Sequence, residues 1–239
     1  MKYSICTGYW SGKGYNGTDD DSKAKFFENV WWPNTIKNSN PVDIFIINPD
    51  SNILPKKYGK WLDLSFNLGH VHDLDENNYY NKRFGGWSMS FILGAMTCYA
   101  NDCDYLFKEQ DCLTFGPWVD KMYEDLNKTR ALMLVGRSQD ADGQGLEQSL
   151  MLIKHEFILE FVTSYLSFNQ NDSGPSFVRP EQKFKYLWSS KYGKLISEMS
   201  FGYGRARPKT YDEEVFYVQK LTPAELNLLD RKKLINLNG

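Results

Sequence analysis

Short, almost continuously apolar segments separated by stretches of helical periodicity constrain this fold more than any other sequence feature. Residues 42–47 read Val-Asp-Ile-Phe-Ile-Ile, 105–107 read Tyr-Leu-Phe, and 131–135 read Ala-Leu-Met-Leu-Val. Such strands are typical of a parallel sheet covered on both faces, because nearly every side chain is buried. We expect further strands at 3–7 and 215–219. Strands that alternate with helices predict an α/β, Rossmann-like fold with a mostly parallel central sheet flanked by helices.

The helical segments follow from apolar spacing and from residues that start or stop helices. The expected helices span residues 19–32, 87–100, 118–126, 146–166, 180–187 and 191–198. Pro33 is expected to end the first of them, and residues 69–73 to form one more short strand. Thr222-Pro-Ala-Glu225 predicts the start of a last helix, with threonine as the N-cap, proline in the first turn and glutamate three residues on.

The chain length and the net charge limit the classes of protein to which this sequence can belong. The 239 residues suit a single domain. We divide it into a nucleotide- and metal-binding half, 1–117, and a half for the acceptor with a C-terminal flap and helix, 118–239. The net charge of −2 gives no electrostatic footprint for nucleic acid. Neither a P-loop nor a Gly-x-Gly-x-x-Gly fingerprint is present, which argues against a P-loop NTPase and a standard dinucleotide-binding fold.

The four cysteines and the apolar runs bear on location. Cys6, Cys98, Cys103 and Cys112 form no Cys-x-x-Cys pair, so we expect free buried thiols in a reducing compartment. No run approaches 18 apolar residues, so we expect no transmembrane segment. The sequence therefore predicts a cytoplasmic protein, and it leaves the oligomeric state undetermined.

Two acids follow the strand expected within Asp104–Cys112. Glu109 and Asp111 are two residues apart, so they point the same way if the chain stays extended. Two carboxylates at the carboxyl end of a strand can hold a hard divalent cation such as Mg²⁺ or Mn²⁺. Ligands of open α/β sheets bind at that same edge. Taken alone, the two acids favour a solvated loop at a strand end, and it is the surrounding sequence that favours a metal site.

The order of these parts resembles a GT-A type glycosyltransferase. The matching parts are Tyr3–Trp10, Arg83–Ser88 with the helix that follows, Asp104–Cys112 and Ala131–Leu166. They cover about the first two thirds of the chain. Glu109 stands where the family has the first aspartate of its Asp-x-Asp motif. The resemblance implies a nucleotide-sugar donor, UDP- or GDP-linked, a glycan acceptor, and a Mn²⁺ or Mg²⁺ cofactor.

The resemblance also implies roles for individual residues. Glu109 and Asp111 are expected to bind the metal, with Asp111 the firmer ligand. The first strand and its loop are expected to hold the nucleotide, through Thr7, Tyr9 and Trp10. Cationic side chains are expected to bind the diphosphate: Arg83 before the second helix, and Arg205 and Arg207 in a glycine-rich flap. For these arginines the alternative is an exposed basic turn, and for the aromatic residues it is core packing.

The resemblance further implies that, in an inverting enzyme, an acid near the start of the helix expected from residue 146 deprotonates the acceptor hydroxyl. Glu147 is the first candidate, with Asp140 and Asp142 next. The alternatives are a helix-start acid stabilised by the helix dipole and a solvated loop.

Two other functional classes stay open from the sequence. A nucleotidyltransferase or phosphohydrolase would use the same acids, and Gly12-Lys13-Gly14 is a faint version of the basic loop it needs. A non-catalytic carbohydrate-binding protein is suggested by the aromatic content of 15%. The donor sugar, the acceptor and the stereochemical outcome are not determined by the sequence.

Overall fold

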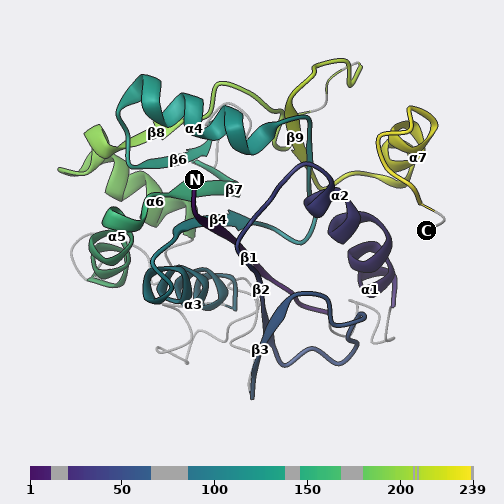
Figure 1. The fold of residues 1–239 in the computed structure, drawn as a ribbon, viewed down its shortest axis with the longest axis horizontal. Helices are drawn as coiled ribbons and strands as arrows, with labels where there is room; N and C mark the ends of the chain where they lie inside the picture. Colours follow the sequence, from purple (N-terminus) through teal and green to yellow (C-terminus); the bar gives the residue numbers. More distant parts are fainter. Residues whose placement is uncertain are drawn as a thin grey trace.

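The computed structural model describes residues 1–11, 21–65, 86–137, 146–167, 180–206, 208 and 210–237 (Figure 1). A seven-stranded sheet runs through its centre in the order β3-β2-β1-β4-β7-β6-β8. The strands are β1 (Tyr3–Gly8), β2 (Ile44–Pro49), β3 (Lys60–Leu64), β4 (Asp104–Lys108), β6 (Met133–Gly136), β7 (Glu147–Ile153) and β8 (Ile196–Glu198). Strands β1 to β4 pair in parallel, as do β6 and β8, whereas β7 is antiparallel to both of its neighbours. The predicted α/β fold with a mostly parallel sheet is confirmed.

Helices cover both faces of this sheet. One face packs against α3 (Gly86–Ala100), α5 (His155–Ser167) and α6 (Pro180–Ser189). The other face packs against α1 (Ser22–Phe26), the π-helix η1 (Phe27–Trp31), α2 (Trp32–Lys37) and α4 (Trp118–Thr129). The middle of strand β4, Tyr105–Phe107, shows why a central strand is apolar at successive positions. Tyr105 and Phe107 join the first cluster and Leu106 the second, so successive side chains are buried on opposite faces.

A second, smaller sheet lies beside the first. It pairs β5 (Cys112–Phe115) with β9 (Phe216–Gln219) in antiparallel register and packs against α7 (Pro223–Arg231). The predicted start of α7 is confirmed as a capping box. Thr222 Oγ1 accepts from the amide of Glu225 at 3.3 Å, and the amide of Thr222 donates to Glu225 Oε2 at 2.7 Å.

The helix expected over 146–166 is wrong in its first half. Residues 147–153 form β7, and α5 begins only at His155. All seven residues of β7 are buried between β4 and β6, and apolar periodicity cannot distinguish such a strand from a buried helix. The helix expected at 191–198 is also wrong, because a short 3-10 turn, η5 (Gly193–Leu195), leads there into β8.

Pro33 does not end the first helix. It lies in the first turn of α2, where the missing amide hydrogen costs no intrahelical bond, and the helical path continues to Lys37. The strand expected at 69–73 lies outside the described residues. All four cysteines are free and buried, as predicted. Among the described helices, none combines the length and apolarity needed to cross a membrane.

Candidate active site

The polar residues of interest meet at one edge of the large sheet. Strands β1 and β4 are parallel neighbours, so Trp10 after β1 and Glu109 after β4 emerge at the same edge. Strand β7 runs in the opposite direction and therefore begins at this edge, with Glu147. The amide of Glu109 donates to the carbonyl of Ser149 at 2.8 Å, which joins the two strands there. Carboxyl edges of this kind are where α/β proteins bind ligands.

Glu109 and Asp111 lie in a tight turn and not in an extended strand. The amide of Cys112 donates to the carbonyl of Glu109 at 3.0 Å, which closes the turn directly after β4. The two acids still interact strongly. Burial raises the pKa of Glu109 to about 8, and the negative charges of Asp111 and Glu147 add to this effect. Burial also raises the pKa of Asp111, whereas Lys220 and Arg205 oppose the rise.

The middle residue of the acidic motif joins this turn to the loop after β1. Gln110 Oε1 accepts from the amide of Trp10 at 3.0 Å, and Gln110 Nε2 donates to the carbonyl of Trp10 at 3.2 Å. The Trp10 ring is 39% exposed, with Lys23 Nζ 4.3 Å from its centre. An exposed indole at this edge can stack on a base or a sugar. Tyr9, by contrast, is fully buried against Phe27 and donates to the carbonyl of Ile53, so it is a core residue.

Glu147 is the first residue of β7 and does not start a helix. Its Oε1 accepts from the amides of Gln148 and Ser149 and from Gln219 Nε2, at 2.8–3.0 Å. Among the described residues no donor hydrogen-bonds to its buried Oε2, which lies 3.6 Å from Arg205 Nε. Burial raises the pKa of Glu147, and the amide of Ser149 and the charge of Arg205 act against this. Oε1 thus accepts three hydrogen bonds, whereas the described residues give Oε2 only the ion pair with Arg205.

Arg205 is the cation that the three acids share. Its charge lowers the pKa of Glu109, of Asp111 and of Glu147. The segment that carries it runs along β9, because the amide of Tyr203 donates to the carbonyl of Tyr217 at 2.8 Å and the amide of Gln219 donates to the carbonyl of Gly204 at 2.9 Å. Arg205 therefore acts on the acids from a segment that lies about fifty residues beyond the end of β7 in the chain.

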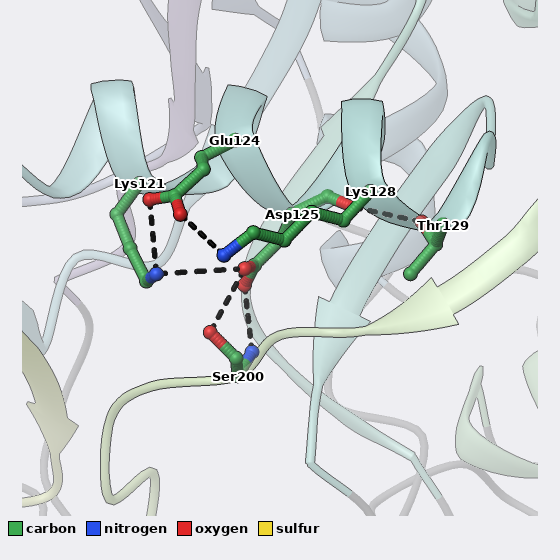
Figure 2. Close-up of polar contacts among 6 residues, drawn as sticks. All are labelled: Lys121, Glu124, Asp125, Lys128, Thr129 and Ser200. Atoms are coloured by element: carbon green, nitrogen blue, oxygen red, sulfur yellow. Dashed lines mark hydrogen bonds and ion pairs between the residues drawn. The ribbon is translucent and has the colours of Figure 1, made fainter.

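The start of the Arg205 segment is fixed to helix α4. Figure 2 shows the buried carboxylate of Asp125 between the helix and the chain at Ser200. Asp125 accepts from the amide of Ser200 at 2.7 Å and from Ser200 Oγ at 2.8 Å, and Lys121 Nζ lies 3.9 Å away. Arg137 donates to the carbonyl of Gly202, two residues further on. These contacts attach the start of the Arg205 segment to α4 at Ser200 and to Arg137 at Gly202.

The buried Lys108 is the last residue of β4, directly before the acidic turn, and it hydrogen-bonds to side chains of α2 and β5. Its Nζ lies 3.0 Å from Asn34 Oδ1, 2.7 Å from Thr35 Oγ1 and 3.1 Å from Thr114 Oγ1. Burial lowers the pKa of this ammonium to about 7. No pattern in the sequence predicts this buried role, because a lysine at a strand end normally reaches solvent.

The other predicted site residues are one buried threonine and four residues outside the described part of the chain. Thr7, near the carboxyl end of β1, is fully buried, and its hydroxyl donates to the carbonyl of Gly8 at 3.3 Å. Arg83, Asp140, Asp142 and Arg207 lie outside the described residues. Sequence reasoning missed Gln110, Gln219 and Trp87. Gln110 could have been suspected as the centre of the acidic motif, whereas Gln219 lies in a distant strand without any local signal.

The donor set fits a hard divalent cation. The charges of Asp111 and Glu147 raise the pKa of Glu109 and that of Arg205 lowers it, and within the described residues the buried Glu147 Oε2 has no hydrogen-bond donor. Within the described residues, no group of three or more histidine, cysteine or acidic side chains has the arrangement of a complete metal site. Mg²⁺ and Mn²⁺ often need only one or two carboxylates, because substrate phosphates supply the remaining ligands. Glu109 and Asp111 are the residues that would hold such an ion.

The architecture is shared with known glycosyltransferases. Neither a family model nor a curated protein matches the chain. A crystal structure of a glycosyltransferase involved in the glycosylation of the major capsid of PBCV-1 superposes with a TM-score of 0.51 at 10% identity, covering 98% of this chain and 100% of that one.

Two further solved structures superpose less well. They are the glycosyltransferase GlyE of Streptococcus pneumoniae TIGR4 (TM-score 0.49, 11% identity) and mouse xyloside xylosyltransferase 1 (TM-score 0.46, 9% identity). The alignments cover 84% and 83% of this chain, and 45% and 85% of those chains, respectively. With the PBCV-1 match, the strand order defines a GT-A-like glycosyltransferase fold.

Proposed function

We propose that this protein is a metal-dependent glycosyltransferase that transfers a sugar from a nucleotide diphosphate donor to a hydroxyl group of a glycan or other acceptor. The observation that carries the proposal is the meeting of Glu109, Asp111 and Glu147 with Arg205 at the carboxyl edge of a GT-A-like sheet. A solvated acidic loop, the alternative, would not hold its carboxylates in buried surroundings that raise their pKa values.

Each residue has a distinct part in the proposed reaction. Asp111 and Glu109 bind the cation, and Trp10 offers its exposed ring to the base or the sugar. Arg205 binds the diphosphate, since a guanidinium suits phosphate geometry. When bound, Mg²⁺ or Mn²⁺ neutralises charge that develops on the leaving diphosphate.

The acceptor step needs a proton acceptor if the reaction inverts the anomeric carbon. The acceptor oxygen then bonds to that carbon, the bond from the carbon to the diphosphate oxygen breaks, and the hydroxyl proton passes to Glu147 Oε2. This oxygen lacks a hydrogen bond, so it can take the proton once Arg205 turns to the diphosphate. The donor sugar and nucleotide, the acceptor, the stereochemical outcome and a cytoplasmic location remain predictions.

Isothermal titration with UDP and GDP, with and without Mn²⁺, tests the proposal. We expect binding that depends on Mn²⁺ and that Asp111→Asn abolishes, because the amide keeps the shape of the carboxylate and removes its charge. Asp102→Asn is the matched control, since Asp102 is exposed near the amino end of β4. Equal affinity in wild type and Asp111→Asn with Mn²⁺ would remove Asp111 from the metal site.

Product analysis separates the remaining classes. Transfer of sugar from a donor to an acceptor supports the proposal. Release of nucleotide from nucleoside triphosphates without sugar transfer indicates a nucleotidyltransferase or phosphohydrolase. Sugar binding without any turnover indicates a carbohydrate-binding protein.

A further inference from the structure

Two indole N–H groups, from different sides of the sheet, hold the residue that begins the acidic turn. Trp31 Nε1, in η1, donates to the carbonyl of Glu109 at 2.8 Å. Trp87 Nε1, in the first turn of α3, donates to Glu109 Oε1 at 2.5 Å. The main chain of Glu109 is thus fixed by one tryptophan and its carboxylate by the other.

The ring of Trp87 is held independently of this hydrogen bond. It stacks on Phe91 at a centroid distance of 5.3 Å and an interplanar angle of 6°. It also meets Phe107 and Phe184 edge-on, at 5.2 and 6.1 Å. Three aromatic rings, one each from α3, β4 and α6, therefore fix the direction in which the N–H group points. A donor fixed by packing can orient a side chain that has three rotatable bonds of its own.

We infer that Trp87 is a positioning residue, whose indole N–H holds Glu109 by Oε1 and so leaves Oε2 available to bind the cation. This inference rests on the proposed function. A free glutamate side chain loses conformational entropy when it becomes ordered. With Trp87 in place, much of that ordering precedes metal binding. Partners that orient a metal ligand typically change metal affinity by about 10–100-fold when they are removed.

Trp87→Phe tests the inference, because it keeps an aromatic ring beside Phe91 and removes the donor. Trp118→Phe is the matched control: Trp118 is fully buried in α4, and its Nε1 has no hydrogen-bond acceptor in the part of the chain that the structure describes. Mn²⁺ binding in the presence of UDP is measured by the loss of the free Mn²⁺ signal in electron paramagnetic resonance. We expect Trp87→Phe to weaken Mn²⁺ binding about tenfold or more, and Trp118→Phe to leave it within about twofold because no carboxylate depends on that indole.

A second arm separates positioning from general loosening of the fold. In a Glu109→Gln background the carboxylate is absent, so Trp87→Phe should cause little further loss of Mn²⁺ affinity. If Trp87→Phe does not fold, 3-benzothienylalanine at position 87 replaces it, since this residue keeps the bicyclic ring and lacks the N–H group. It should show the same loss of affinity.

Each outcome decides between the inference and the proposed function. If Trp87→Phe or the benzothienyl variant binds Mn²⁺ as well as Trp118→Phe does, Trp87 has no positioning role. An equal loss in the wild-type and Glu109→Gln backgrounds likewise overturns the inference and leaves the proposed function standing. If wild type binds no Mn²⁺ even with UDP, the proposed function fails and the inference falls with it.

Discussion

Asp125→Ala is expected to destabilise the protein and to loosen the segment that carries Arg205. The buried carboxylate of Asp125 accepts two hydrogen bonds from Ser200, at 2.7 and 2.8 Å (Figure 2). Hydrogen bonds to a charged group contribute roughly 1.5–3 kcal/mol each to stability. Ser200 itself is exposed, so water can replace part of this interaction. We therefore expect the low end of the range, a loss of about 3 kcal/mol for the two bonds together.

Thermal unfolding measures this loss. For a chain of this length, 1 kcal/mol shifts Tm by roughly 2–4 °C, so Asp125→Ala should lower Tm by about 6–12 °C. Asp125→Asn should fall between wild type and alanine, because its amide keeps one acceptor oxygen. Hydrogen exchange at residues 201–206 should become faster in both variants, since the segment loses its attachment to α4.

Glu124→Ala is the matched control for this prediction. Glu124 is the neighbouring residue of the same helix, and its carboxylate pairs with Lys121 and Lys128 on the surface. Exposed ion pairs contribute little, because water screens them. If Asp125→Ala lowers Tm no more than Glu124→Ala does, the contact with Ser200 does not stabilise the fold, and the reasoning is refuted.

Three further changes test other parts of the structure. Gly202→Ala should lower the free energy of unfolding, measured with urea, by more than about 3 kcal/mol, because φ is +94° and a Cβ atom would lie 2.1 Å from the ring of Tyr217. A loss below about 1 kcal/mol would contradict this geometry. Thr222→Ala should cost about 1 kcal/mol in the same assay through loss of the capping box with Glu225, and an unchanged midpoint would show that the cap is dispensable. Glu147→Gln should lower turnover by about 10²–10⁴-fold and leave UDP affinity near wild type; a change of only a few-fold would favour another acid or a retaining mechanism.

The fold could be predicted because its signals are local. The apolar runs Ile44–Ile47 of β2 and Tyr105–Phe107 of β4 are contiguous in the sequence, and the capping residues of α7 lie within four positions of each other. The prediction of a helix over 146–166 failed because the apolar pattern of a fully buried strand cannot be distinguished from that of a buried helix. Residues 147–153 form a strand only because β4 and β6 flank them, and this context lies outside the segment itself.

The candidate site likewise has one part that the sequence predicts and another that only the tertiary structure shows. The sequence by itself determined that Glu109 and Asp111 follow a buried strand, since strand and acids are contiguous. Tertiary structure alone decided that Glu147 stands beside them, that Arg205 is their shared cation, and that Trp87 binds Glu109. Contacts between residues 22 to 96 positions apart leave no local trace, because only the pairing of strands and the packing of helices bring such residues together.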